Sequence, residues 1–282
     1  MSVNSNMKYL KLMKRADYTI VQLKRDKANP INARMISEIR LLFRHLENDP
    51  KVRGVVLTGQ ENFFSAGLDL IEMYDLDERG IKTFWTNFMG MISDLVSFPK
   101  PLVAAITGHS PAGGCVLAIC CDYRVMAKGR FTIGLNEIPI GIVLPETIFH
   151  LYSFWIGQHK AYQYLLEGEL LNPAEALSVG LIDELVEENK VQIIAEQKLK
   201  KYLTFDSDTW QNSKMNIRKE LIKKLDVDIN TLLEPLLKQW WQPATRNRVA
   251  AMVKTLSRGK VNQTSRGSVN QTKGGANSNR RR

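Results

Sequence analysis

Cysteine and histidine are scarce in this chain of 282 residues, which has three cysteines and four histidines. Cys115, Cys120 and Cys121 lie close together in an apolar segment, and no histidine stands at metal-ligand spacing from them. This pattern argues against a disulfide framework and against a zinc site. We expect reduced, buried thiols and no bound metal. A glycine pattern suited to a nicotinamide cofactor is also missing.

Long apolar runs are absent as well. The most apolar stretches, residues 102–106 and 116–121, are separated by Gly, His and Pro. They fall far short of the roughly 18 residues that a membrane crossing needs. The N-terminal stretch has basic residues but lacks the apolar core of a secretory signal. We therefore expect a soluble, cytoplasmic protein without a membrane span, and a mitochondrial location stays open.

Acidic residues are missing from residues 257–282, which hold seven Lys and Arg. This segment supplies most of the formal net charge of +10 and leaves +3 for the rest of the chain. It is rich in Gly, Ser, Asn and Gln and has few apolar residues to offset the entropy of ordering, so we predict a disordered basic tail. A solvated appendage is favoured over a polyanion-binding arm, and nucleic acid is not an expected partner.

The whole chain is 44% hydrophobic and 24% charged, an ordinary globular composition. Its periodicity alternates between strands and helices. Strands are predicted at residues 18–23, 52–57, 102–106 and 123–127, and helices at residues 33–46, 82–98 and 113–121. This alternation favours an α/β fold with helices packed on a mostly parallel sheet.

Helical periodicity dominates from about residue 173 onward. Helices are predicted at residues 191–203, 210–224, 230–241 and 246–256. We expect Trp240 and Trp241 to serve packing or a subunit interface. The predicted organisation is a core over residues 1–200, a C-terminal helical region over residues 201–256 that serves oligomerisation, and the basic tail over residues 257–282.

Two turns of small residues each follow a predicted strand and precede a helix. The first is Ser65-Ala66-Gly67, and the second runs from Ser110 to Gly114. Backbone amides at such helix starts lie open and can bind a negatively charged oxygen, and two such turns on one sheet can face a single carbonyl. The spacing alone is equally compatible with tight turns that need glycine for backbone reasons.

Four segments together carry a family resemblance. They are FSAGLDL at residues 64–70, PAGGC at 111–115, CDYR at 121–124 and IGLNEIPIG at 133–141. In order and spacing they resemble the enoyl-CoA hydratase/isomerase, or crotonase, family over roughly residues 15–200, with wording nearest to its Δ3,Δ2-enoyl-CoA isomerases. The resemblance implies a spiral of repeated ββα units with a C-terminal helical region, a homotrimer or hexamer, and an acyl-CoA thioester substrate. Coenzyme A would be part of that substrate, and no separate cofactor is implied.

The resemblance also implies the site residues. The backbone amides of Ala66 and Gly113 would hold the thioester oxygen, and Glu137 would be the proton-transferring base. Val116 stands where hydratases of the family have a further glutamate, which favours an isomerase. Substrate-binding positions would be Ser65, Gly67, Leu68, Asp69, Leu70 and Gly114. A hydratase, another crotonase-family acyl-CoA enzyme and a catalytically silent acyl-CoA-binding relative remain the alternatives.

Other polar side chains are expected to have lesser roles. We expect Asp69 to cap the adjoining turn, His109 to be structural, and Asp122 to pair with Arg124. Glu146 is the main rival carboxylate to Glu137.

Two further sets of residues are candidates for contacting substrate. Trp85, Phe88 and Met89 either line an acyl tunnel or pack in the core. The coenzyme A phosphates would meet Lys24, Arg25 and Lys27, although loops are commonly charged.

Overall fold

The structure, a computed structural model, describes the backbone of residues 7–272 and the side chains of residues 7–258. A six-stranded sheet forms its centre, in the order β1-β2-β3-β5-β7-β10. β1 runs antiparallel to β2, and the other neighbouring pairs are parallel. The strands are β1 (Leu10–Lys14), β2 (Thr19–Leu23), β3 (Val55–Thr58), β5 (Leu102–Ile106), β7 (Tyr123–Ala127) and β10 (Glu184–Val186). The central strands β3 and β5 are buried throughout, as expected of a parallel sheet covered on both faces.

A second, smaller sheet has the order β4-β6-β8-β9. Its strands are β4 (Asn62–Phe63), β6 (Gly108–Pro111), β8 (Ile133–Gly134) and β9 (Leu170–Leu171). β3, β5 and β7 of the large sheet are each followed along the chain by β4, β6 and β8 of the small sheet, and then by helical structure. The chain therefore forms the repeated ββα units that the resemblance implied.

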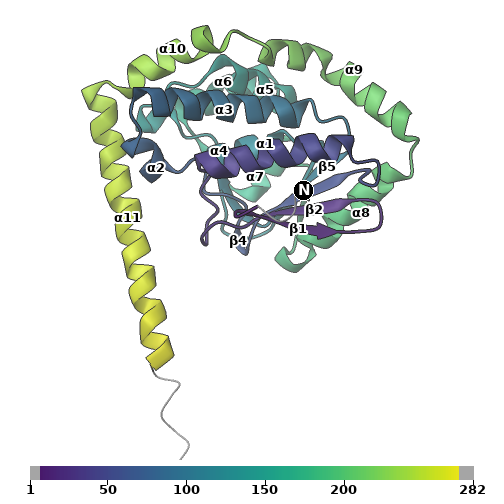
Figure 1. Cartoon of the computed structure of the whole chain (residues 1–282), viewed down its shortest axis with the longest axis horizontal. Coiled ribbons are helices and arrows are strands. Elements are labelled where there is room, and N and C mark those ends of the chain that lie inside the picture. The colour runs from purple at the N-terminus through teal and green to yellow at the C-terminus, as the bar shows by residue number, and fades with distance from the viewer. Residues whose placement is uncertain (1–6, 273–282) are drawn as a thin grey trace, which may run out of the picture.

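Helices cover both faces of the large sheet. α1 (Ala33–Asn48) and α3 (Glu78–Val96) lie side by side over one face (Figure 1). α8 (Val191–Leu203) packs on the central strands β3, β5 and β7. α2 (Leu70–Asp75) and α4 (Gly113–Ile119) begin at the two small-residue turns, and every residue of α4 is buried. The two turns are thus anchored to the core.

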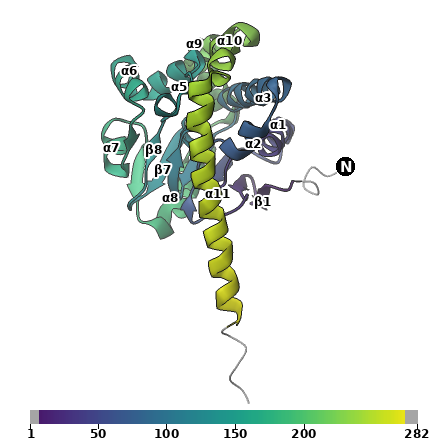
Figure 2. The ribbon, with the colours of Figure 1, turned by 90° about the vertical axis from the view of Figure 1, so that its left-hand side faces the viewer.

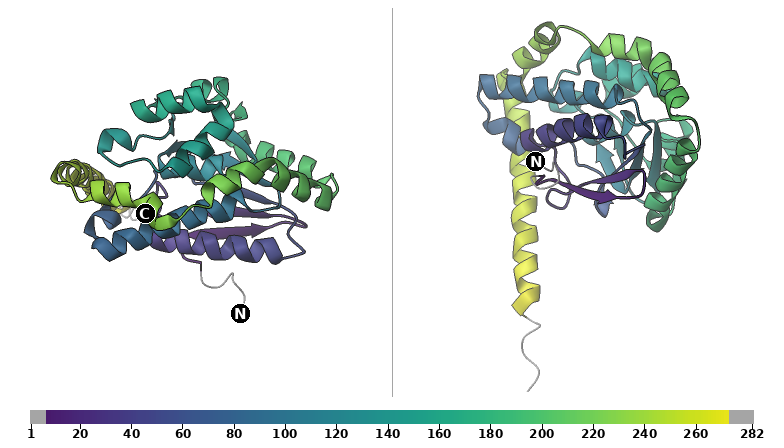
Figure 3. Two further views of the ribbon diagram at one scale, coloured as in Figure 1. Left: turned by 90° about the horizontal axis from the view of Figure 1, so that it is seen from above. Right: turned by 45° about the vertical axis from the view of Figure 1, so that its right-hand side comes forward.

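The remaining helices surround this core. They are α5 (Glu146–Ile156), α6 (Gln158–Glu167), α7 (Pro173–Ser178), α9 (Ser207–Leu225), α10 (Ile229–Trp240) and α11 (Pro243–Thr272), with short 3₁₀ turns η2 (Ile138–Ile140) and η3 (Glu188–Lys190). α9 and α10 run around the outside of the body (Figure 3). α11 starts beside α2 and projects away from the body (Figure 2). Trp240 is buried, in keeping with a packing role, and Trp241 is half-buried.

The C-terminal part differs from expectation at one point. α11 continues as a helix through residues 257–272, for which we predicted disorder, and residues 273–282 lie outside the described residues. The boundaries of the three predicted regions stay predictions. Within the described part of the chain, no helix is both long and apolar enough to cross a membrane.

Candidate active site

The side chain of Ser65 stabilises the first small-residue turn. The Ser65 hydroxyl donates to the Asn29 carbonyl at 2.8 Å and accepts the Gly67 N–H at 3.1 Å. Gly67 has a φ of +89°, which favours glycine. A Cβ at Gly67 would lie 2.9 Å from the Cβ of Ala112 and 3.3 Å from the Gly113 nitrogen. The two predicted turns are therefore in direct contact, and their small residues permit this approach.

The loop before α1 uses almost every backbone group of this turn. The Ala66 N–H donates to the Ala28 carbonyl at 2.8 Å, the Ile31 N–H to the Gly67 carbonyl at 2.8 Å, and the Asp69 N–H to the Ile31 carbonyl at 2.8 Å. The Ala66 amide is therefore not a free donor, which corrects the sequence-based assignment. Among the described residues the Leu68 N–H has no hydrogen-bond partner. In a parallel bridge such as Ile31–Leu68, alternate residues make the bonds, so Leu68 is left free.

The second turn supplies another free amide. Ala112 precedes α4 with a φ of +50°, a conformation that costs a non-glycine residue strain. Gly113 is the first residue of α4, where an N–H has no intrahelical acceptor, and the described residues provide no other. A Cβ at Gly113 would lie 3.0 Å from Cδ2 of Leu68. The unpaired amides of Leu68 and Gly113 thus belong to residues in mutual contact.

Gly114, in the second turn, also permits the two turns to approach each other closely. A Cβ there would lie 2.5 Å from the Ser65 carbonyl oxygen, so any larger residue would push the turns apart. Ala112 in turn donates its N–H to the Gly134 carbonyl at 2.7 Å. That bond, with the β6–β8 pairing, connects the second turn to the segment that carries Glu137.

Glu137 differs from the other carboxylates of this region in its hydrogen bonding and in its pKa. Its Oε2 atom is buried and has no hydrogen-bond partner in the described part of the chain. Burial raises the pKa of Glu137 to about 7. Its charge also helps to raise the pKa of Cys115, which directly follows Gly114, and that of Tyr152, although burial is the larger cause for both. Glu137 therefore lies beside the second turn in a desolvated environment.

The neighbouring carboxylate positions differ from Glu137. Val116 is 2% exposed on α4, so an apolar side chain fills the place of the hydratases' further glutamate. Glu146, the rival carboxylate, is exposed at the start of α5. In the described residues, no three His, Cys, Asp or Glu side chains are grouped so as to hold a metal ion.

Several other predicted roles can be compared with the structure. Asp69 caps α2 by accepting from the N–H groups of Ile71 and Glu72. His109 bonds Thr132 through Nδ1 at 3.1 Å and contacts the rings of Phe63 and Phe131, a structural role as predicted. Leu70 is a buried residue at the start of α2.

The predicted Asp122–Arg124 pair is wrong. Arg124 lies in β7 and pairs with Asp183, which precedes the neighbouring strand β10, at 2.6 Å. Asp122 instead faces α9 and pairs with Lys214 at 2.8 Å and Arg218 at 3.0 Å. The sequence pattern missed these two cations because α9 reads as a solvated, highly charged helix.

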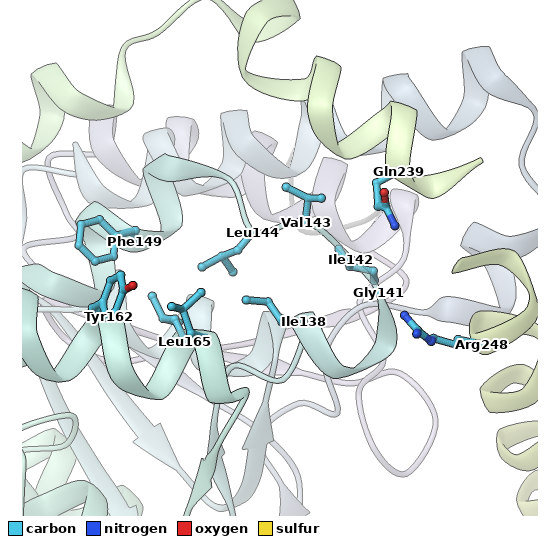
Figure 4. A pocket seen from close by; sticks show the side chains of 11 residues that line it. Ile138, Gly141, Ile142, Val143, Leu144, Phe149, Tyr162, Leu165, Gln239 and Arg248 are labelled. Carbon is cyan, nitrogen blue, oxygen red and sulfur yellow. The ribbon is translucent and has the colours of Figure 1, made fainter. Parts of the chain in front are cut away.

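An apolar groove of about 500 Å³ begins at the residues that follow Glu137 (Figure 4). It is lined by Ile138, Gly141, Ile142, Val143, Leu144, Phe149, Tyr162, Leu165, Leu166, Gln239 and Arg248. A second space of about 450 Å³ shares Val143 and Leu144 with the groove and lies between α5 and α10. A third, of about 250 Å³, shares Val227 and Leu232 with the second and is also lined by Met89. Trp85 and Phe88 are buried in the core.

Fold and site together define an α/β protein in which two unpaired backbone amides and one carboxylate with a buried oxygen come from successive ββα units. Sites of this class are suited to a negative charge that develops on a carbonyl oxygen. The family model for enoyl-CoA hydratase/isomerase matches residues 15–235. The chain belongs to this family.

Individual relatives agree with this assignment. The chain is 40% identical over 220 residues to mouse "Enoyl-CoA delta isomerase 1, mitochondrial", covering 76% of each chain. It is 34% identical over 224 residues to the human protein of that name, covering 77% of this chain and 74% of the relative. The crystal structure of human mitochondrial delta3-delta2-enoyl-CoA isomerase superposes with a TM-score of 0.86 at 29% identity, covering 90% of this chain and all of that one.

Proposed function

We propose that this protein is a Δ3,Δ2-enoyl-CoA isomerase, which moves a carbon–carbon double bond of an unsaturated fatty acyl-CoA from position 3 to position 2. The observation that carries the proposal is the combination of Glu137, whose Oε2 atom is buried and unpartnered, with the unpaired amides of Leu68 and Gly113, all within the described residues. The mouse and human relatives named above support the same reaction.

The amides of Leu68 and Gly113 would form the oxyanion hole. Removing a proton from C2 of a 3-enoyl thioester leaves a dienolate, whose negative charge rests largely on the thioester oxygen. Two fixed N–H donors stabilise that charge, and losing one such donor typically costs about 3 kcal/mol of transition-state stabilisation. Leu68 replaces Ala66 in this role because the Ala66 amide is already bonded to Ala28.

Glu137 would carry the proton. Its carboxylate takes the proton from C2, and the resulting carboxylic acid returns it to C4, so that the double bond ends between C2 and C3 and the carboxylate is restored. A carboxylate with a pKa raised to about 7 is a stronger base than an exposed one. Hydration would need a water to be oriented and a proton delivered, work suited to two carboxylates, and Val116 occupies the second place.

The substrate's remaining parts fit the surroundings of the site. We propose that the acyl chain follows the three neighbouring apolar spaces, which share lining residues, and that the coenzyme A moiety meets the loop before α1. Of the basic residues there, Lys24 and Lys27 are exposed and suited to phosphates. No separate cofactor is needed, because the proton leaves and returns within one substrate. We keep a cytoplasmic location as the prediction, although the relatives named here are mitochondrial, and fractionation of tagged protein decides between the two.

Incubation of the purified protein with a 3-enoyl-CoA tests the proposal directly. We expect conjugated 2-enoyl-CoA as the product, and little 3-hydroxyacyl-CoA when 2-enoyl-CoA is supplied instead. Glu137→Gln should lower kcat by at least about 100-fold while binding of a saturated acyl-CoA persists. Retained turnover in Glu137→Gln, or hydration as the main reaction, would contradict the assignment. Glu220→Gln is the matched control and should leave turnover unchanged, because Glu220 is exposed on α9 and lines none of the three spaces. Glu146→Gln tests the rival carboxylate, which borders the second space, and should retain most of the turnover.

A further inference from the structure

The loop of residues 24–32 fixes the direction of the Leu68 N–H. A peptide unit is planar and trans, so the Gly67 carbonyl and the Leu68 N–H point in opposite directions. The Gly67 carbonyl accepts the Ile31 N–H at 2.8 Å, and the Asp69 N–H donates to the Ile31 carbonyl at 2.8 Å. Leu68 is therefore held on both sides by Ile31, with its own N–H turned away from the loop.

Arg25 links the loop before α1 to the turn that carries Leu68. Its Nη1 atom donates to the Pro30 carbonyl at 2.6 Å, and its Nη2 atom donates to Oδ2 of Asp69 at 2.5 Å. The side chains of Arg25 and Asp69 are 11% and 5% exposed. The other oxygen of Asp69 accepts the N–H groups of Ile71 and Glu72 at the start of α2. One guanidinium thus joins the residue before Ile31 to the residue after Leu68.

We propose that Arg25 is a positioning residue for the Leu68 amide and not a ligand of the coenzyme A phosphates. Both terminal nitrogens of its guanidinium are engaged inside the protein, in the forked geometry that a lysine ammonium cannot reproduce. This inference rests on the proposed function in one respect: it takes the Leu68 amide to be a donor to the thioester oxygen.

The test compares Arg25→Met, Arg25→Lys and Asp69→Asn with Arg34→Met as matched control. Arg34 also faces the Tyr9 ring, with its guanidinium carbon 5.9 Å from the ring centroid against 5.4 Å for Arg25. It is 52% exposed and pairs with Glu38 on its own helix. Arg34→Met therefore removes a positive charge from the same neighbourhood without touching the turn.

The decisive readout is the ionisation of bound acetoacetyl-CoA. The enolate of this compound places negative charge on its carbonyl oxygens, so oxyanion donors lower the pKa at which the bound compound ionises. The absorbance of the enolate, followed against pH, measures that pKa without any turnover. A variant that is merely less stable but correctly folded leaves it unchanged.

We expect Arg25→Met to raise the enolate pKa toward the value for acetoacetyl-CoA in solution. With 3-enoyl-CoA, kcat should fall by about 10- to 100-fold while KM stays within about threefold. This loss of kcat is smaller than the loss expected when an oxyanion donor is removed completely, because the Leu68 N–H is displaced and not deleted. Arg25→Lys and Asp69→Asn should show smaller shifts in the same direction, and they carry the comparison if Arg25→Met does not fold. Arg34→Met should match the wild type.

Two results would overturn the inference. One is an enolate pKa in the folded Arg25 variants equal to that of the wild type. The other is a loss of activity confined to KM, which would mark Arg25 as a phosphate ligand. The two proposals can fail separately. If the wild type lowers the enolate pKa, the Arg25 variants do not, and the wild type still does not isomerise 3-enoyl-CoA, the proposed function is wrong and the positioning role of Arg25 is supported.

Discussion

At the scale of single residues, the small side chains of the two turns have a steric cause. Added Cβ atoms at Gly67 and Gly114 would meet the opposite turn at 2.9 Å and 2.5 Å. Real Cβ atoms do not approach other atoms so closely, so the chain needs glycine at both positions. The contact in turn brings Leu68 beside Gly113, so that the two unpaired amides belong to neighbouring residues.

The charge state of Glu137 gives a prediction on pH. Its active form is the carboxylate, and burial raises its pKa to about 7. We expect kcat/KM to rise about tenfold per pH unit below that value and to level off above it. Initial rates with 3-enoyl-CoA between about pH 5.5 and pH 8.5 measure this. A profile that is already flat at the acidic end would show that Glu137 is not the base.

The same shift bears on stability, and its sign is opposite to that of a salt-bridged acid. Because folding raises the pKa of Glu137 from 4.5 to about 7, ionisation opposes folding as pH rises through this window. Glu137→Gln should therefore gain up to about 3 kcal/mol in the free energy of unfolding above pH 7 and almost nothing below pH 4.5. Urea unfolding at both ends of the range serves as an independent control on the environment of this side chain.

The sequence led us to predict Glu137 as the base and the amides of Ala66 and Gly113 as the donors, and the structure shows that the Ala66 N–H is already bonded to Ala28, while the roles of Glu137 and Gly113 stay predictions. A side chain reveals its chemistry in the sequence, whereas every residue except proline carries the same N–H. Whether that N–H is free depends on the register of a distant strand-like loop, here the bridge between Ile31 and Leu68. That the Leu68 N–H has no partner among the described residues therefore emerges only from the structure.

At the scale of elements, the strands and helices with strong periodicity were predicted well. β5, β7 and α8 have the predicted bounds, because their apolar patterns end at turn residues. α3 starts four residues before the predicted residue 82, because Asp77 caps it by accepting the Gly80 N–H. The two-residue strands of the small sheet have no periodicity of their own and were not predicted.

α9 shows how a highly charged helix can be attached to a core. Lys214 and Arg218 point inward and are 5% and 4% exposed, and both contact Asp122. Arg218 also donates to the carbonyl groups of Val96, Cys120 and Cys121. Buried charges and hydrogen bonds therefore attach this helix to the core, together with the buried side chain of Leu221.

Removing the shared anion should therefore be costly. Asp122→Asn leaves two buried cations without their counter-charge, and we expect it to lower the free energy of unfolding by about 3–5 kcal/mol. The control is Glu187→Gln, which breaks the exposed ion pair between Glu187 and Lys128. The side chain of Glu187 is 61% exposed and that of Lys128 is 53% exposed, so the loss of this pair should cost less than about 1 kcal/mol. Chemical unfolding of both variants measures the difference. Equal costs would show that the buried network does not hold α9 in place.

At the scale of the whole molecule, one side of the protein exposes large apolar side chains. Tyr162 and Leu166 of α6 are 63% and 53% exposed and line the groove next to the Glu137 segment. Scattered apolar residues are normal on a surface, but a groove lined by several of them is typical of a contact site. The homotrimer or hexamer that we predict from the sequence would cover this side.

The assembly state can therefore be tested through α6. We expect native mass spectrometry to show three or six copies of the chain, and Leu166→Glu to shift the population toward single chains, because a carboxylate loses its hydration when the face is covered. Ile217→Glu is the matched control, since Ile217 is 71% exposed on α9 and does not line the groove. Circular dichroism should show both variants folded. If the wild type is a single chain, or if Leu166→Glu and Ile217→Glu assemble alike, α6 is not a subunit contact, and its apolar residues then belong to the substrate groove alone.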